Sequence, residues 1–435
     1  MGLLSMFNRK SGSGGDKEDQ VDSLDASLDY EAADALLCRD EITDSRNRLC
    51  GYRFSFQPTV ADGDAPEDAF FEVLEATEVP AFAARRMALI PVSGEAIAEG
   101  RHVPLIASYT VFQVDSLQST MEAATLAGHL TTLRRSGPKV ALTVSHKNPA
   151  PPVLLPQADI LMLNLHEGTV EEFQAQLQKL KASNPHSKIA VDGVDTWDEQ
   201  RMCLSLGCEF CLGAYMSTPD EIDPDGRLDQ GRVTSIQLLN LLRSDADVTE
   251  LSEVAKRDPG LTFQLLKWAN APGIGTTTAV TSLSQAIIVL GRNHLYRWLT
   301  VSMFRLGEDK ERDESLLEIA LTRARFMETA GPKSMPKAQR DELFLVGMLS
   351  LFDLLLKMPM AKILEQMHLA DDIREVLLNG EGPYGPYLKM VLLLERNQVE
   401  KGLAIAEQLG IESDALAEAG SAAFAWAQEA LSASQ

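Results

Sequence analysis

Three closely spaced cysteines are the residues whose pattern most directly suggests metal chemistry. Cys203, Cys208 and Cys211 are separated by four and then two residues, which is the spacing of a plant-type iron–sulfur site. Such a cluster needs a fourth ligand, which could come only from Cys38 or Cys50. Cys203 falls in a helical pattern, and the other two flank an apolar, strand-like run. We therefore interpret the three as small buried side chains and expect no cofactor.

The histidines offer no pair that could hold a cation. None is followed by an aspartate, and no two stand at helical spacing, although adjacent imidazole and carboxylate groups are what a metal-dependent phosphohydrolase uses. The seven are His102, His129, His146, His166, His186, His294 and His368. The sequence therefore predicts no metal site from histidine.

The elements that would position reactive groups change character near residue 222. Up to that point, short apolar runs alternate with helical stretches such as 121–133 and 170–180, and this alternation predicts a parallel sheet, most economically a (β/α) barrel. The expected strands are 49–56, 87–92, 110–114, 139–144, 160–165, 188–191 and 210–215.

Beyond residue 222 the chain is expected to be all helical. Asp247, Asp258 and Ser282 each fit the N-cap of a helix, the second with Pro259 in the first helical position, and Gly291 fits a helix end. We therefore predict three parts: a flexible tail over 1–29, a barrel over 30–222 and a helical domain over 223–435.

Composition narrows the classes of partner. The formal net charge is −23, so nucleic acid would be repelled over most of the surface. No apolar run reaches the roughly 20 residues that span a bilayer, and the N-terminus lacks the order of an export signal. We expect a cytoplasmic protein with no membrane insertion, whose oligomeric state the sequence leaves open.

Two segments of the helical part resemble the HDOD family. Its pattern is a helix ending in Ala-Asn, a loop and a helix ending in Leu-Gly, as in 261–270 followed by 287–291. Residues 344–353 are similar to the helix on which true HD hydrolases carry paired His-Asp metal ligands. Those two positions are Ser350 and Leu351 in this chain, so the resemblance implies an HDOD domain without that metal site.

The first half resembles the EAL family of cyclic di-GMP phosphodiesterases. The segments that carry this likeness are 51–57, 158–164, 191–196 and 206–215, in this order and with helices between them. The resemblance implies a TIM-like barrel fused to an HDOD domain, an arrangement known for these families.

Taken residue by residue, the resemblance implies that most of the catalytic and ligand groups have been replaced. The signature glutamate falls on Arg53, the arginine that grips phosphate falls on Gln57, and acids remain only at Asp192 and Asp195. The other replaced positions are Pro91, Gln113, Thr143, Val144, Met162, Asn164 and Leu212. Because hydrolysis with two metal ions needs several carboxylates at the barrel top, we expect that the chain is not an enzyme.

The resulting prediction is a bacterial signalling adaptor that contacts a regulatory protein and tunes motility or surface behaviour. A receptor that binds cyclic di-GMP without cutting it is the alternative, and an active phosphodiesterase ranks last. The candidate partner-binding residues are Asn270, Gly273 and Gly275, together with Tyr296 and Trp298, which we expect to be exposed. Two plainer interpretations stay open: the glycine loop only turns the chain, and Trp298 packs in the core.

Overall fold

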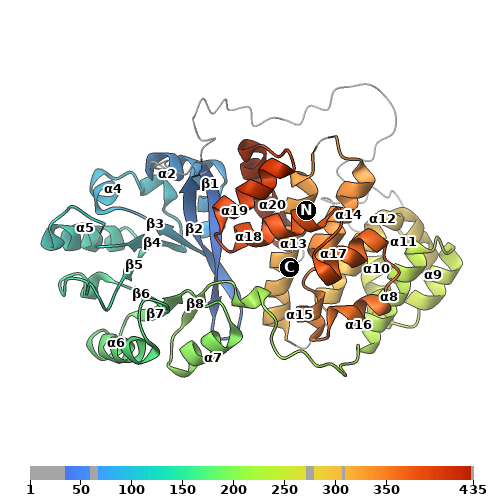
Figure 1. Ribbon diagram of the computed structural model, residues 1–435, viewed down its shortest axis with the longest axis horizontal. Coiled ribbons are helices and arrows are strands. Elements are labelled where there is room, and N and C mark those ends of the chain that lie inside the picture. Colours follow the sequence, from blue (N-terminus) through green and yellow to red (C-terminus); the bar gives the residue numbers. More distant parts are fainter. Residues whose placement is uncertain are drawn as a thin grey trace. The chain divides into compact units, whose positions relative to one another are not determined.

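The computed structural model describes residues 35–58, 67–116, 118–270, 279–305, 309–332 and 334–432. Contacts divide the chain into two compact units, which are described separately (Figure 1). The barrel unit contains Asp34–Thr218 and Leu392–Ala404; the helical unit contains Pro219–Val391 and Ile405–Gln435. Residues 392–404 therefore pack with the barrel, although they follow the helical domain in the sequence. The predicted tail, 1–29, lies outside the described residues.

Eight strands close into a barrel in chain order, as Figure 1 shows in blue to green. They are β1 (Ala35–Asp44), β2 (Leu49–Pro58), β3 (Met87–Pro91), β4 (Thr110–Val114), β5 (Lys139–Thr143), β6 (Ile160–Asn164), β7 (Lys188–Asp192) and β8 (Phe210–Leu212). Strands β2 to β8 are parallel to one another, whereas β1 is antiparallel to both β2 and β8. The predicted barrel class and its seven predicted strands are confirmed.

The strand that the sequence did not predict is β1. Its charged residues, among them Arg39 and Asp40, mask the apolar alternation of Leu36, Cys38 and Ile42, which are all buried. A tight hairpin joins β1 to β2, so no helix intervenes to give the βα pattern.

The strand predicted over 210–215 is shorter than expected. Gly213 has a φ of +147°, and a Cβ there would lie 2.2 Å from the Val194 carbonyl oxygen. The strand therefore ends at Leu212, and a 3₁₀ helix follows at Tyr215–Ser217.

Helices surround the barrel between its strands. They are α2 (Glu67–Ala76), α3 (Val79–Ala83), α4 (Gly94–Glu99), α5 (Ala123–Arg135), α6 (Val170–Ser183) and α7 (Trp197–Ser205). Helices α6 and α7 each begin with a capping box. The Thr169 and Thr196 hydroxyls each accept a hydrogen bond from the backbone N–H of the glutamate three residues later, and the side chain of that glutamate accepts one from the backbone N–H of the threonine.

The barrel interior is filled by apolar side chains. Because side chains alternate across a strand, every second residue points inward. The cluster consists of Ile42, Leu89, Val111, Ala141, Ile160, Met162, Ala190, Phe210 and Leu212. Beyond this packed interior, the carboxyl ends of the parallel strands carry polar side chains, such as Gln113, Thr143 and Asp192, and form the barrel mouth.

The helical unit confirms the all-α prediction. It is built from α8 (Gln230–Arg243), α9 (Val248–Ala255), α10 (Pro259–Ala269), α11 (Leu283–Leu290), α12 (Arg292–Ser302), α13 (Lys310–Ala330), α14 (Lys337–Leu349), α15 (Phe352–Leu356), α16 (Met360–Glu365), α17 (Asp371–Asn379), α18 (Gly385–Glu395), α19 (Val399–Gln408) and α20 (Ser413–Ser432). The last residues of α18 and the first residues of α19 belong to the barrel unit.

The three predicted N-caps are confirmed. Asp247, Asp258 and Ser282 each accept a hydrogen bond from a backbone N–H in the first turn of α9, α10 and α11. Gly291 ends α11 with a φ of +70°, a left-handed backbone angle that glycine adopts without strain. Among the described residues, none of the helices is long and apolar enough to cross a membrane.

Candidate functional site at the barrel mouth

The strand register brings most of the predicted site positions to one ring. Pro91 of β3 pairs with Gln113 of β4, and Thr143 of β5 pairs with Met162 of β6. Asn164 pairs with Asp192, which in turn pairs with Leu212. Residues far apart in the sequence therefore meet at the carboxyl ends of the strands, where barrel folds carry their functional groups.

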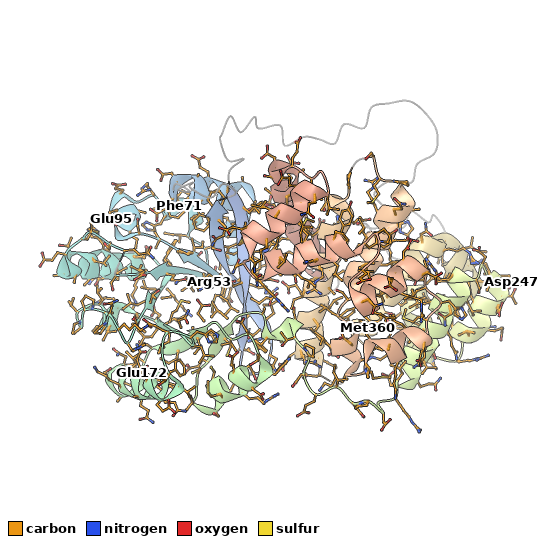
Figure 2. All side chains as sticks on the ribbon, in the orientation of Figure 1. Arg53, Phe71, Glu95, Glu172, Asp247 and Met360 are labelled. Atoms are coloured by element: carbon orange, nitrogen blue, oxygen red, sulfur yellow. The ribbon has the colours of Figure 1, made fainter. Side chains whose placement is uncertain are left out.

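Arg53 lies at the centre of the polar contacts in this ring; Figure 2 labels it on β2. Its Nε donates to Asp40 Oδ2 at 2.8 Å. Its Nη1 and Nη2 donate to the two carboxylate oxygens of Asp192, at 2.5 and 3.0 Å. One guanidinium thus bridges carboxylates from β1 and β7 in the bidentate geometry that arginine favours.

This cluster is partly shielded from water. The side chains of Arg53, Asp40 and Asp192 are 18%, 11% and 27% exposed. Burial alone would lower the pKa of Arg53, but the Asp40 and Asp192 carboxylates raise it above its ordinary value. The arginine therefore stays charged.

Asp40 is the site residue that sequence reasoning missed. Its Oδ1 also accepts a hydrogen bond from Asn397 Nδ2, so residues 392–404 of the barrel unit reach the same cluster. The signal was the alternation of Leu36, Cys38 and Ile42, which puts Asp40 on the inward face of β1.

Neutral polar groups complete the mouth. Gln113 Nε2 donates to Thr143 Oγ1 at 3.1 Å, while Gln113 Oε1 is buried without a hydrogen-bond partner. Asn164 Oδ1 accepts from the backbone N–H of His166 at 2.8 Å. Met162 and Leu212 belong to the packed interior and offer no polar atom.

The remaining predicted positions lie around this ring. Gln57 is half-buried on β2, four residues beyond Arg53. Val144 is buried directly after β5, and its N–H donates to the Met162 carbonyl oxygen. Asp195 is 62% exposed, and its Oδ2 lies 3.9 Å from His166 Nε2.

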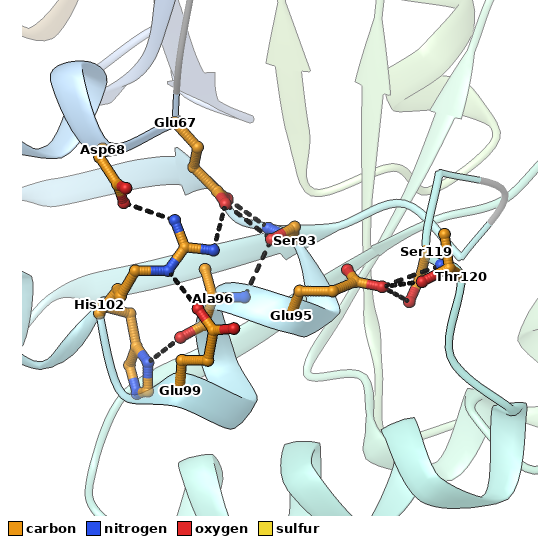
Figure 3. A network of polar contacts seen from close by, with 10 residues as sticks. Glu67, Asp68, Ser93, Glu95, Ala96, Glu99, His102, Ser119 and Thr120 are labelled. Carbon is orange, nitrogen blue, oxygen red and sulfur yellow. Dashed lines mark hydrogen bonds and ion pairs between the residues drawn. The ribbon is translucent and has the colours of Figure 1, made fainter.

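A polar network fixes the loops that follow β3 and β4 (Figure 3). Glu67 accepts hydrogen bonds from both the N–H and the hydroxyl of Ser93, at 2.6 and 2.7 Å. Glu95 accepts from the Thr120 hydroxyl and N–H, which lowers the pKa of the Glu95 carboxyl. The rim of the mouth is thus tied together by carboxylates that are already engaged.

The prediction of no metal site concerns the His, Cys, Asp and Glu side chains of the described part of the chain. No group of three or more His, Cys, Asp and Glu side chains there is arranged to hold an ion. Cys203, Cys208 and Cys211 are free and buried. The hydrogen bond with Cys208 would lower the pKa of Cys203, but the hydrogen bond with Cys211 and burial raise it to about 12. Thiols with raised pKa values are poor metal ligands.

An arginine also lies beside the two HD-type positions of the helical unit. Ser350 follows α14, accepts from Arg323 Nη1 at 2.8 Å and donates to the Gly347 carbonyl oxygen at 2.8 Å. Leu351 is buried, and burial raises the pKa of the neighbouring Asp353. The place predicted to have lost its metal ligands therefore holds a fixed organic cation, Arg323, which is 2% exposed.

The candidate partner-binding residues differ in their exposure to solvent and in their contacts. Asn270 is exposed, but its side chain bonds to both backbone groups of Val280. Tyr296 is buried, so its expected exposure is wrong. Trp298 is half-buried and stacks on Trp268, with ring centroids 5.1 Å apart. Gly273 and Gly275 lie outside the described residues.

Comparison with known proteins defines the class of the helical unit. A model of the HDOD domain matches residues 232–371, so the chain combines an eight-stranded barrel with an HDOD domain. The cyclic di-GMP phosphodiesterase CdgJ of Vibrio cholerae is 25% identical over 297 residues, which are 68% of this chain and 68% of CdgJ. The uncharacterised protein YuxH of Bacillus subtilis is 28% identical over 224 residues, which are 50% of this chain and 54% of YuxH.

Solved structures of EAL-domain proteins are also similar to parts of this chain. One from Listeria monocytogenes is 14% identical, with a TM-score of 0.33, and the match covers 42% of this chain and 87% of that one. YkuI of Bacillus subtilis is 12% identical, with a TM-score of 0.35, over 57% and 70% of the two chains. The strand order of this chain by itself defines a closed barrel.

One prediction requires correction. The expectation that the chain is not an enzyme is contradicted by its similarity to CdgJ, which is named a phosphodiesterase and aligns over 68% of this chain. The expectation rested on the replaced residues, which a resemblance alone had assigned to catalytic positions.

Proposed function

We propose that this chain acts in cyclic di-GMP signalling and that its HDOD domain contacts a regulatory protein. The similarity to CdgJ supports the link to the dinucleotide. An alignment of 297 residues is longer than either compact unit, so it includes parts of both. The two domains are thus expected to serve one signalling pathway.

The observation that carries the protein contact is the exposure of large apolar side chains on two neighbouring helices. Phe263 of α10 and Ile288 of α11 are each 67% exposed, and Val289 is 37% exposed. Phe263 and Ile288 are more exposed than every other large apolar side chain of the described residues. Aromatic and aliphatic groups left in water in this way favour a protein partner that covers them.

The experiment compares signalling in cells that carry variants of these side chains. A strain lacking the chain is complemented with wild type, with the double variant Phe263→Ser and Ile288→Ser, or with Leu378→Ser, which changes a 43% exposed side chain of α17. The double variant should fail to restore motility even when it is present at the same level as the wild-type protein, whereas Leu378→Ser should restore it. Full restoration by the double variant would exclude this surface.

A photo-crosslinking amino acid at position 263 identifies the partner directly. It should give an adduct that is absent with the same group at position 378. Adducts that are equally strong at both positions would indicate non-specific contact.

A second candidate function is recognition of cyclic di-GMP at the barrel mouth. It is favoured by the guanidinium of Arg53, since a planar fork of donors suits phosphate. Asp40 and Asp192 already engage this group, so the dinucleotide would have to displace at least one carboxylate.

Calorimetric titration of the full chain with cyclic di-GMP tests this second function. Chromatography of the products, with and without Mn²⁺, measures turnover in parallel. Turnover would extend the activity named for CdgJ to this chain, and saturable binding alone would indicate a receptor. If neither occurs, the mouth has no role toward the dinucleotide.

A further inference from the structure

A basic pocket lies at the end of the barrel opposite the mouth. It has a volume of about 390 Å³ and is formed by the last turn of α5 and the starts of β5 and β6. Its charged lining residues are Arg134, Arg135, Lys139 and Asp159. Because β5 and β6 begin here, the pocket is separated from Arg53 by the length of the strands and by the packed interior.

Asp159 is the only carboxylate of this lining, and its oxygens are already engaged. Arg134 donates to them through Nη2 at 2.7 Å and Nε at 3.1 Å, and the backbone N–H of Val140 adds a third bond at 2.9 Å. These contacts hold Arg134 in place and neutralise it. No carboxylate of the lining remains to neutralise the positive charges of Arg135 and Lys139.

Arg135 and Lys139 have no counter-ion among the described residues. Both side chains are exposed, and neither belongs to an ion pair of the structure. The chain as a whole carries a net charge of −23, so two adjacent uncompensated cations run against its average surface. Their joint field favours an anion in the pocket between them.

Helix capping does not account for this arrangement. Basic residues in a last turn often satisfy free carbonyl oxygens and oppose the helix dipole. Here the N–H groups of Ser136 and Gly137 already bond to the carbonyl oxygens of residues 132–134. Lys139 is outside the helix, at the start of β5, and is not explained by the dipole at all.

A neutral donor completes the pocket. Gln157 Oε1 accepts a hydrogen bond from Thr131 Oγ1 at 2.9 Å, which leaves the amide NH₂ of Gln157 available to donate. Both residues line the pocket. Side chains with three kinds of donor therefore line the pocket: a guanidinium, an ammonium and an amide.

We propose that this pocket binds a small molecule through a phosphate group. Arginine forks and lysine ammonium groups are the side chains that bind phosphate oxygens most often, and an amide donor can take a further oxygen. A volume of about 390 Å³ lies in the range of small-molecule sites. It has room for more than a free phosphate ion, which points to an organic phosphate such as a nucleoside monophosphate.

Calorimetric titration of the full chain with 5′-GMP, inorganic phosphate and citrate tests the site. Saturable binding of 5′-GMP is expected, with weaker binding of inorganic phosphate because the organic part adds contacts. If inorganic phosphate binds as tightly as 5′-GMP, the site holds the ion alone and the organic phosphate is refuted. Tighter binding of citrate than of either phosphate would overturn the phosphate assignment.

Matched charge variants decide whether binding occurs in this pocket. Arg135→Gln and Lys139→Gln should each weaken 5′-GMP binding about tenfold, because each removes a charge-assisted hydrogen bond. Lys179→Gln removes an exposed positive charge from α6, outside the pocket, and should leave binding unchanged. Equal loss in all three variants, or no saturable binding to wild type, would refute the site. Both pocket residues are exposed, so the variants should keep the circular dichroism spectrum and thermal midpoint of wild type.

Discussion

Arg53 and Asp192 are 139 residues apart in the sequence and form a bidentate ion pair across the barrel mouth, with N···O distances of 2.5 and 3.0 Å. The pair reaches from β2 to β7 over the two strands between them, β1 and β8. Asp40 on β1 accepts a third hydrogen bond from the same guanidinium. One organic cation in the mouth is thus bound by carboxylates of two other strands, β1 and β7.

Replacement of Arg53 by methionine should destabilise the barrel by about 2 kcal/mol, because it leaves two poorly solvated carboxylates without a cation. The reduction is measured as a lower free energy of unfolding in urea. Arg201→Met is the matched control, since Arg201 is 50% exposed and pairs with Asp198, which is 93% exposed. Its cost should be below about 1 kcal/mol.

A double-mutant cycle separates the contribution of the Arg53–Asp192 ion pair to stability from the other effects of each substitution. In a double-mutant cycle with Asp192→Asn, Arg53→Met should cost less than it does in the wild type, because one carboxylate has already been neutralised. Additive costs in this cycle would show that the ion pair contributes nothing of its own.

The positions of the mouth could be predicted from the sequence, but their contacts could not. Strand alternation puts Thr143, Asn164 and Asp192 at carboxyl ends of strands, and the parallel barrel then brings them to one ring. The partners of Arg53 depend on β1, whose four charged residues hid its strand pattern. A side chain's partner across a barrel is set by closure of the sheet, which no local pattern encodes.

Asn270 should be important for the connection between α10 and α11. Its Oδ1 accepts from the Val280 N–H, and its Nδ2 donates to the carbonyl oxygens of Val280 and Leu266, all at 2.8 Å. Asn270→Ala removes all three bonds and should lower the free energy of unfolding by about 1–2 kcal/mol. Hydrogen exchange of the Val280 amide should also become faster.

Asn379→Ala is the control for this prediction. The Asn379 side chain is exposed and, among the described residues, donates only to Glu375, one turn back on α17. Its loss should change stability by less than about 0.5 kcal/mol. Unchanged protection of the Val280 amide in Asn270→Ala would show that the side chain does not hold this connection.

Two helical glycines should respond in opposite ways to alanine. A Cβ on Gly347 of α14 would lie 2.4 Å from Ala324 Cα and 2.7 Å from Ala324 N on α13, so the helices would have to move apart. Gly347→Ala should therefore destabilise the helical unit by about 1–3 kcal/mol. A Cβ on Gly128 of α5 meets no atom within 4 Å, so Gly128→Ala should stabilise by about 0.5–1 kcal/mol. Denaturant melts measure both, and a neutral Gly347→Ala would mean that the crossing of α13 and α14 is looser than described.

Local signals predicted the helical unit better than its packing. The caps at Asp247, Asp258 and Ser282 act within one turn, so their residue types are sufficient evidence. Tyr296 was expected to be exposed but is buried, because the surface that a helix presents depends on which helices pack against it. The close approach of Gly347 to Ala324 likewise depends on how α14 packs against α13.

Asp313 on α13 should make the stability of the helical unit depend on pH. Burial raises its pKa from 3.8 to about 6, although the charges of Arg232 and Arg312 oppose this rise. In the unfolded chain the carboxyl has its ordinary pKa of 3.8. Between these values the folded protein holds a proton that the unfolded chain has lost, so this contribution to stability is complete below about pH 4 and is lost as the pH rises through about 6.

Asp313→Asn removes this titration. The free energy of unfolding of the variant, relative to wild type, should therefore rise by about 1–2 kcal/mol between pH 4 and pH 7, after allowance for solvent screening. The comparison uses the difference between the two proteins, so other groups that titrate in both cancel. Asp198→Asn, which changes a carboxylate that is 93% exposed, serves as the control and should show a much smaller difference. If the difference between Asp313→Asn and wild type stays constant with pH, or falls as the pH rises, the Asp313 carboxyl is ionised throughout and its burial is balanced by Arg232 and Arg312.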